Sequence, residues 1–250
     1  MRRPLLHVAV AVLLVLAGCS VLADDPVREP AAVDRLNATQ DRVDDVSSYR
    51  YNMTVNASSS GSSRRIDGHG VGAVNVTTKR KVINASLDGT RAVTYIDNRT
   101  AYTECQFPGT GWGRQSLSAE SGWTELTVLG RQLALLSTGD LYHNGTERID
   151  GQEVVHLSGR PTDDALSGDD GSSSVSVFDS SKADEVTVHL WVDAETNRPV
   201  RTDLRVVSRA NDETATATLA VRYRGYGDPV RISIPEEARD PFYDTGCPGS

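Results

Sequence analysis

The strongest constraint on the fold is an alternation of apolar and polar residues with a period of two, which recurs along the chain. Tyr51, Met53 and Val55 alternate with polar residues, and residues 186–193 and 214–223 repeat the pattern. Successive side chains of a β-strand point to opposite faces of a sheet. The pattern therefore predicts strands with one buried and one solvated face.

Further strands are expected between these segments, separated by short turns. They cover residues 66–78, 80–87, 91–96, 100–106, 146–150, 153–158, 200–208 and 231–234. Glycine-rich residues 109–122 and acidic, serine-rich residues 161–184 are interpreted as loops. The strands follow one another without a strand–helix–strand rhythm, which favours an antiparallel sheet.

Two segments have helical periodicity instead. Residues 31–46 and residues 124–136 place apolar side chains at steps of three and four, as Leu129 and Leu133 do. A sheet with one apolar face must cover that face, and these two helices are the segments available to do so. The sequence therefore predicts an α+β fold, a curved antiparallel half-barrel sheet with helices in its concave face.

The N-terminus has the pattern of a cleaved lipoprotein signal peptide. Two arginines precede an apolar run from Leu5 to Leu16, and small residues lead to Cys19. We expect residues 1–18 to be removed and the Cys19 thiol to carry a lipid. That lipid anchors the protein to the extracytoplasmic face of the cell membrane. A retained transmembrane helix is the alternative, but the run is shorter than the roughly 20 residues that a span needs.

The rest of the chain divides into three parts. Residues 19–30 are polar and contain two prolines, which predicts a flexible tether. Residues 31–235 carry the strand and helix patterns and form the folded domain. Residues 236–250 are a C-terminal tail.

Cysteine usage points to one disulfide. With Cys19 assigned to the lipid, Cys105 and Cys247 remain. Two cysteines in an exported protein favour a disulfide between them. Two unpaired thiols, with Cys247 in a frayed tail, are the alternative.

Seven Asn-X-Ser/Thr sequons mark candidate N-glycosylation sites. Asn37 lies close to the apolar stripe of the first predicted helix, which makes it the weakest. The other candidates are Asn52, Asn56, Asn75, Asn84, Asn98 and Asn144. Glycans require solvent, so these asparagines are expected on exposed surface, and Asn52 and Asn56 fall on the polar side of their strand.

The charge balance excludes one class of partner. The formal net charge is −8, and nucleic-acid binding requires a basic surface. Lysine is scarce, with Lys79, Lys81 and Lys182 the only ones. An acidic, lysine-poor surface resembles those of halophilic proteins, and base-composition bias is the other explanation.

Catalytic motifs are not found. His69, His143, His156 and His189 lack metal-ligand spacing, and no serine lies in a nucleophile elbow. The glycine clusters at 68–72 and 109–113 do not follow a strand and open a helix, as a dinucleotide site requires. We therefore expect no enzyme activity, no metal and no cofactor.

Several motifs resemble the LolA-like lipoprotein fold, which the mycobacterial LppX/LprG-type lipoproteins share. They are residues 48–51 (SYRY), 95–102 (YIDNRTAY), 149–157 (IDGQEVVHL), 190–193 (LWVD), 198–201 (RPVR) and 226–235 (YGDPVRISIP). These motifs mark turns and strand ends, and the likeness covers most of residues 33–235. Members of that family bind acylated molecules in an apolar hollow.

The resemblance implies a binder or carrier of lipid or another hydrophobic ligand. The residues expected to line its hollow are Tyr51, Met53, Val55, Leu129, Leu133, Leu190, Val192, Leu219 and Val221. The alternative is a non-enzymatic envelope protein with a structural or interaction role, in which the same residues are packed core. An apolar cavity of several hundred Å³ favours the first reading, and a filled interior favours the second.

Overall fold

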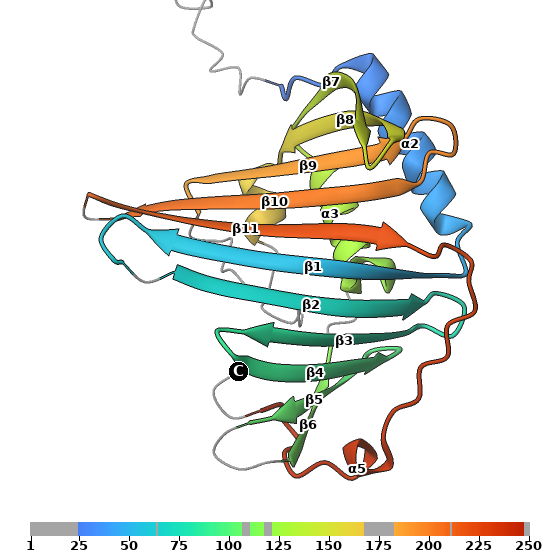
Figure 1. Ribbon diagram of the computed structural model, residues 1–250, viewed down its shortest axis with the longest axis vertical. Coiled ribbons are helices and arrows are strands. Elements are labelled where there is room, and N and C mark those ends of the chain that lie inside the picture. The colour runs from blue at the N-terminus through green and yellow to red at the C-terminus, as the bar shows by residue number, and fades with distance from the viewer. Residues whose placement is uncertain are drawn as a thin grey trace, which may run out of the picture.

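The computed structural model describes residues 25–63, 65–106, 111–117, 122–167, 183–210 and 212–247. These residues build one antiparallel sheet of 11 strands, in the order β6-β5-β4-β3-β2-β1-β11-β10-β9-β8-β7 (Figure 1). The sheet curves, and its edge strands β6 and β7 do not pair with each other. The predicted half-barrel is therefore confirmed.

The strand bounds follow the period-two pattern closely. They are β1 (Ser48–Ser59), β2 (Arg65–Asn75), β3 (Arg80–Leu87), β4 (Thr90–Asp97), β5 (Thr100–Cys105), β6 (Gly111–Ser116), β7 (Asp140–Ile149), β8 (Gln152–Arg160), β9 (Glu185–Asp193), β10 (Pro199–Ala210) and β11 (Glu213–Arg224). Some expectations are wrong: β6 forms inside the expected glycine-rich loop, and no strand forms at residues 231–234. In addition, β7 begins six residues before the strand expected from residue 146, and residues 163–167 of the expected acidic loop form a short helix.

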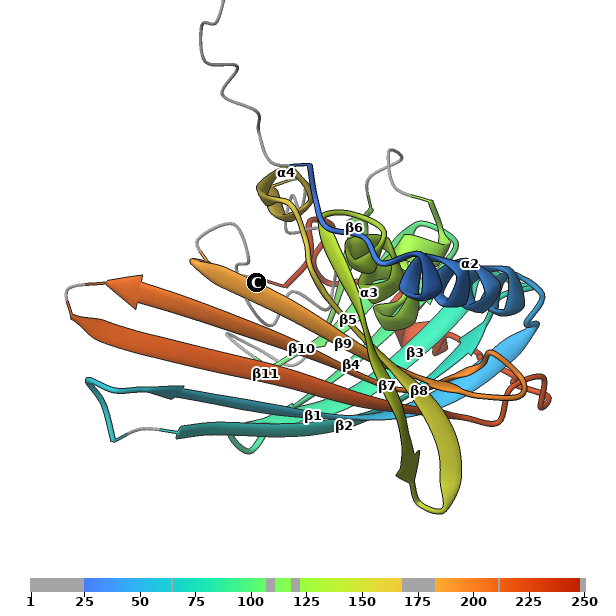
Figure 2. The same cartoon turned by 90° about the horizontal axis from the view of Figure 1, so that it is seen from above.

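The helices lie on the concave side of the sheet, where Figure 2 shows α2 and α3 together. Their bounds are α2 (Pro30–Asp44), the 3₁₀ helix η1 (Thr124–Leu126), α3 (Val128–Leu136), α4 (Asp163–Ser167) and α5 (Glu236–Arg239). None of the helices in the described part of the chain has the length and apolar character needed to cross a membrane.

Local residue chemistry determines where the two covering helices, α2 and α3, begin. Pro30 occupies the first turn of α2, where its missing N–H costs nothing. Thr127 has an extended backbone, and its hydroxyl accepts a hydrogen bond from Gly130 N at 3.1 Å. This cap starts α3, so the single helix expected over residues 124–136 is instead a 3₁₀ turn followed by an α-helix.

The inner face of the sheet and the helices form one hydrophobic core. Strand register places Tyr51 opposite Tyr223 on one side and opposite Gly72 on the other. Leu219 and Leu190 share this inner face, and they pack in the same cluster as Leu129 of α3.

The N-terminal described segment covers the β7 edge of the sheet. Arg28 forms a parallel bridge with Leu141, and Glu29 N donates to Leu141 O at 3.0 Å. Arg28 and Glu29, which fall within the tether expected over residues 19–30, are bound to the sheet. Residues 1–24, including the proposed signal peptide and Cys19, lie outside the described residues.

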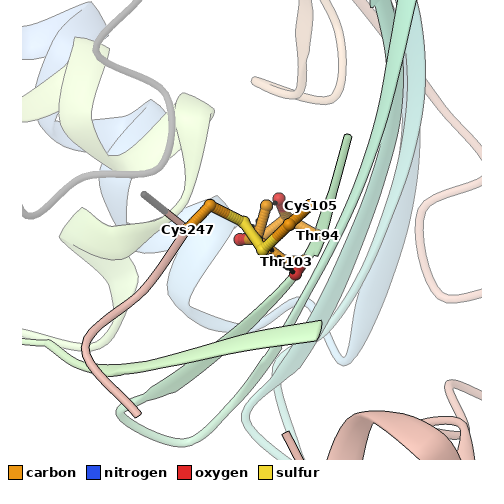
Figure 3. The surroundings of a disulfide bond; sticks show 4 residues. All are labelled: Thr94, Thr103, Cys105 and Cys247. Atoms are coloured by element: carbon orange, nitrogen blue, oxygen red, sulfur yellow. Dashed lines mark hydrogen bonds between the residues drawn. A yellow bond between two sulfur atoms is a disulfide. The ribbon is translucent and has the colours of Figure 1, made fainter. Parts of the chain in front are cut away.

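The C-terminal segment covers the opposite edge. Tyr243 bridges Gly113 of β6, and a disulfide joins Cys247 to Cys105 at the end of β5 (Figure 3). A Cβ atom on Gly113 would lie 2.7 Å from Cys247 N, so only glycine permits this approach. Pairing both edges shields backbone groups that otherwise template aggregation.

Candidate functional site

Three glycines of β2 shape the inner face of the sheet. Gly68, Gly70 and Gly72 all face inward, in register with Val55, Met53 and Tyr51 of β1. A Cβ atom on Gly70 would lie 2.7 Å from Met53 Cε, and one on Gly72 would overlap the Tyr51 phenol ring. The glycine run is therefore neither a phosphate loop nor a bend. It lets side chains of β1 lie across β2.

An apolar pocket lies beside this region, over the middle of β1 and the last residues of β3. Its volume is about 170 Å³. The inward side chains that line it are Met53, Val55, Ile83, Ala85, Ala92 and Thr94. Leu87, 41% exposed, lies at its rim. The apolar lining suits a compact hydrophobic group, because an engineered apolar cavity of about 150 Å³ binds benzene.

The predicted hollow is only partly this pocket. Of the predicted residues, Met53 and Val55 line the pocket. The others lie in the packed core, each 4% exposed or less: Tyr51, Leu129, Leu133, Leu190, Val192, Leu219 and Val221. Helix α3 covers β8, β9 and β10, which fills that half of the concavity. The pocket lies over β1 to β4 instead.

A cluster of buried tyrosines borders this core. The Tyr51 ring lies 6.4 Å from the rings of both Tyr49 and Tyr223. Burial raises the pKa of all three phenols, so they stay protonated. Tyr223 Oη lies 2.9 Å from Thr202 Oγ1 and donates to Gln132 Oε1 at 3.3 Å. Tyr51 Oη, in contrast, has no hydrogen-bond partner among the described residues.

Lys81 is the unexpected polar residue of the concave face. It is 1% exposed, and its Nζ donates to the backbone oxygen of Leu126 in η1. Desolvation lowers the pKa of Lys81 to about 7. The spacing in the sequence indicates this placement. Lys81 lies two residues from Ile83 and four from Ala85, so the alternation of a strand puts all three on the same face of β3.

The outer face carries a separate cluster of ring side chains. His156 stacks on Trp191 with ring centroids 4.5 Å apart, and its Nε2 lies 2.9 Å from His189 Nδ1. Burial lowers the pKa of both imidazoles. Glu147 lies 3.6 Å from the His156 ring, and Arg201 lies over the Trp191 ring. From the sequence, these two histidines showed only a lack of metal-ligand spacing, and nothing placed them side by side.

The glycosylation candidates differ in their surroundings. Asn52, Asn56, Asn98 and Asn144 are exposed. Asn75 is half-buried, and its Nδ2 donates to the Val230 oxygen at 2.8 Å.

Asn84 is also half-buried and accepts a hydrogen bond from Arg91. Asn37 is exposed on α2, although its position near the apolar stripe argued against exposure.

The fold has counterparts among solved structures. LprF from Mycobacterium bovis aligns with a TM-score of 0.50 and 16% identity, over 84% of this chain and 99% of LprF. The chain therefore shares the fold of LprF.

LppX from Mycobacterium tuberculosis aligns with a TM-score of 0.49 and 14% identity, over 82% of this chain and 100% of LppX. A LolA superfamily protein from Nitrosomonas europaea aligns with a TM-score of 0.33 and 13% identity, over 82% of this chain and 95% of that protein. No protein-family model and no curated protein matches the sequence. At 16% identity the likeness to LprF establishes the fold alone, and the function rests on the site.

Proposed function

We propose that this LolA-like protein is a non-enzymatic binder or carrier of a hydrophobic ligand, held in the pocket over β1 to β4. The observation that carries the proposal is the apolar pocket beside Leu87, although its volume of about 170 Å³ is smaller than the several hundred Å³ expected from the sequence. Burial of apolar surface contributes roughly 25 cal/mol per Å², so such a pocket favours apolar groups without any charged contact. Its size suits a small ring or the end of one acyl chain.

We propose further that the ligand is bound outside the cytoplasm, on a protein anchored to the membrane through lipidated Cys19. The signal-like N-terminus supports this placement. The acidic net charge of −8 disfavours nucleic acid as a partner.

A second candidate function is an envelope interaction protein without a ligand. The observation that favours it is the packed core around Leu129, Leu190 and Leu219, where a wide hollow was expected. Crosslinking on intact cells distinguishes the two functions, because an interaction protein gives a defined envelope complex and its purified form binds no hydrophobic probe.

Filling the pocket tests the primary proposal. Ala85→Phe places a ring in the pocket, whereas Val82→Phe places the same ring on the opposite face of β3. We expect native mass spectrometry to detect a hydrophobic ligand that copurifies with the wild-type protein. We also expect saturable binding of ethylbenzene by calorimetry, lost in Ala85→Phe and retained in Val82→Phe. An empty wild-type protein that binds no ethylbenzene would refute the proposal.

A further inference from the structure

Two histidines meet on the outer face of the sheet, the face opposite to the one that holds the apolar pocket. His156 lies on β8 and His189 on β9, which are neighbouring strands (Figure 1). Each histidine lies between two buried apolar residues of its strand, so the alternation turns both imidazoles outward. Both residues are partly exposed, and the two rings are therefore within reach of a solute.

The spacing of the two rings matches that of adjacent ligands on one metal ion. His156 Nε2 lies 2.9 Å from His189 Nδ1. Imidazole nitrogens bind Zn²⁺ at about 2.0–2.1 Å. Two nitrogens held at such distances and at right angles, as in the square-planar geometry of Cu²⁺, lie about 2.9 Å apart.

Metal binding requires a change of proton position but no net loss of a proton from the neutral pair. In the hydrogen bond between the rings, one of the two facing nitrogens carries a proton. On metal binding that proton moves to the far nitrogen of the same ring, so that both facing nitrogens present lone pairs and both imidazoles stay neutral. A small rotation of each ring directs its lone pair at the ion.

The groups around the pair favour a cation. Glu147 Oε1 lies 3.6 Å from His156 Nδ1, the nitrogen that faces away from His189. A carboxylate in this position orients a metal-bound imidazole and raises its basicity. Asp203 lies opposite His189 in the register and forms an ion pair with Arg201. These two carboxylates and one guanidinium leave a net negative charge beside the pair.

We propose that His156 and His189 form a binding site for a divalent transition metal ion, with Cu²⁺ preferred. Within the described residues, no group of three or more His, Cys, Asp or Glu side chains is arranged to hold a metal ion, so water fills the remaining coordination positions. A given set of nitrogen ligands binds Cu²⁺ more tightly than Ni²⁺ or Zn²⁺. The two histidines are 33 residues apart in the chain, which explains why ligand spacing in the sequence did not indicate a site.

The test uses Cu²⁺ as the probe, added to the untagged protein in a buffer that does not bind metals. Electron paramagnetic resonance shows how many imidazole nitrogens bind the ion, and calorimetry measures its affinity. His156→Asn and His189→Asn each remove one ligand. His69→Asn is the matched control, because it makes the same change at an exposed histidine on the outer face of β2.

We expect two coupled imidazole nitrogens in the wild-type protein and in His69→Asn. His156→Asn and His189→Asn should each retain one nitrogen at most and lose at least about 10-fold in affinity for Cu²⁺. Zn²⁺ should compete for the same site with lower affinity.

A wild-type spectrum without two coupled imidazole nitrogens overturns the proposal, and this measurement depends on no variant. An affinity for Cu²⁺ that is unchanged in both His156→Asn and His189→Asn overturns it as well. Neither result bears on the pocket over β1 to β4, because the two sites lie on opposite faces of the sheet.

Discussion

Replacing Lys81 by methionine removes a buried amine from the concave core. Methionine has nearly the same length and flexibility, so the variant keeps the packing against η1 while losing the charge. The change tests whether this lysine makes the stability of the protein depend on pH above neutrality.

The magnitude follows from the pKa of Lys81, which burial lowers from 10.5 to about 7. Each pKa unit corresponds to about 1.4 kcal/mol, so the protonated core lysine costs the folded state up to about 5 kcal/mol. Between pH 7 and 10.5 the unfolded chain binds the proton and the folded chain releases it. Stability therefore rises with pH in this window, by roughly 2 kcal/mol between about pH 7 and about pH 9.

The variant is expected to lose this slope. At neutral pH, Lys81→Met gains about 4 kcal/mol by removing the buried charge and loses about 1–3 kcal/mol because the Leu126 oxygen loses its donor. A net gain of roughly 1–3 kcal/mol follows at about pH 7.

Urea denaturation followed by circular dichroism, at a series of pH values, measures both quantities. Lys79→Met is the control at an exposed position and should keep the wild-type slope. A wild-type stability that is flat from neutral to mildly alkaline pH contradicts the reasoning. A Lys81→Met variant that keeps the full slope does the same.

Three further predictions concern the rest of the molecule. Cys247→Ala opens a 142-residue loop and should lower the unfolding free energy by up to roughly 5 kcal/mol in urea titrations; a loss below about 1 kcal/mol argues that the segment contributes little. Burial lowers the pKa values of His156 and His189, so the unfolded chain takes up protons before the folded protein as the pH falls below about 6.5. His189→Asn should therefore reduce the loss of folding stability in this acidic range. An unchanged dependence of stability on pH in the variant contradicts this reasoning. Peptide mass spectrometry of the native protein should find glycan at exposed Asn52 and none at Asn75, whose amide is bonded to the C-terminal segment; a fully occupied Asn75 would be contrary to expectation.

The strands were predictable where each had one buried face. Residues 80–87 were expected as a strand and form β3 over the same residues, although Lys81 lies on its buried face. Residues 214–223 were expected as a strand and form most of β11 (Glu213–Arg224). The alternation is a local property of the sequence, and burial of one face makes it reliable.

Elements that depend on distant partners were not predictable. The glycines of β6 read as a loop because glycine lowers strand propensity. They nevertheless form a strand, whose outer edge is bridged by the C-terminal segment. Glycine at position 113 allows the backbone of Cys247, more than a hundred residues away in the chain, to approach closely. Conversely, residues 231–234 alternate like a strand, and Ile232 and Ile234 are buried. They form no strand, because among the described residues the two sheet edges, β6 and β7, are already bridged by Tyr243 and Arg28.

The pocket depends both on the local alternating pattern and on distant partners, because it forms where small residues of adjacent strands are aligned. The register places Gly70 opposite Ala85, and Ala85 opposite Ala92, so three small residues meet at one place on the inner face. The sequence reveals each small residue but not this alignment. A two-residue shift between β2 and β3 would keep every side chain on its face, yet it would place Ile83 or Leu87 opposite Gly70 and fill the space. The presence of the pocket is therefore a property of register, while the curved sheet around it is a property of the alternating pattern.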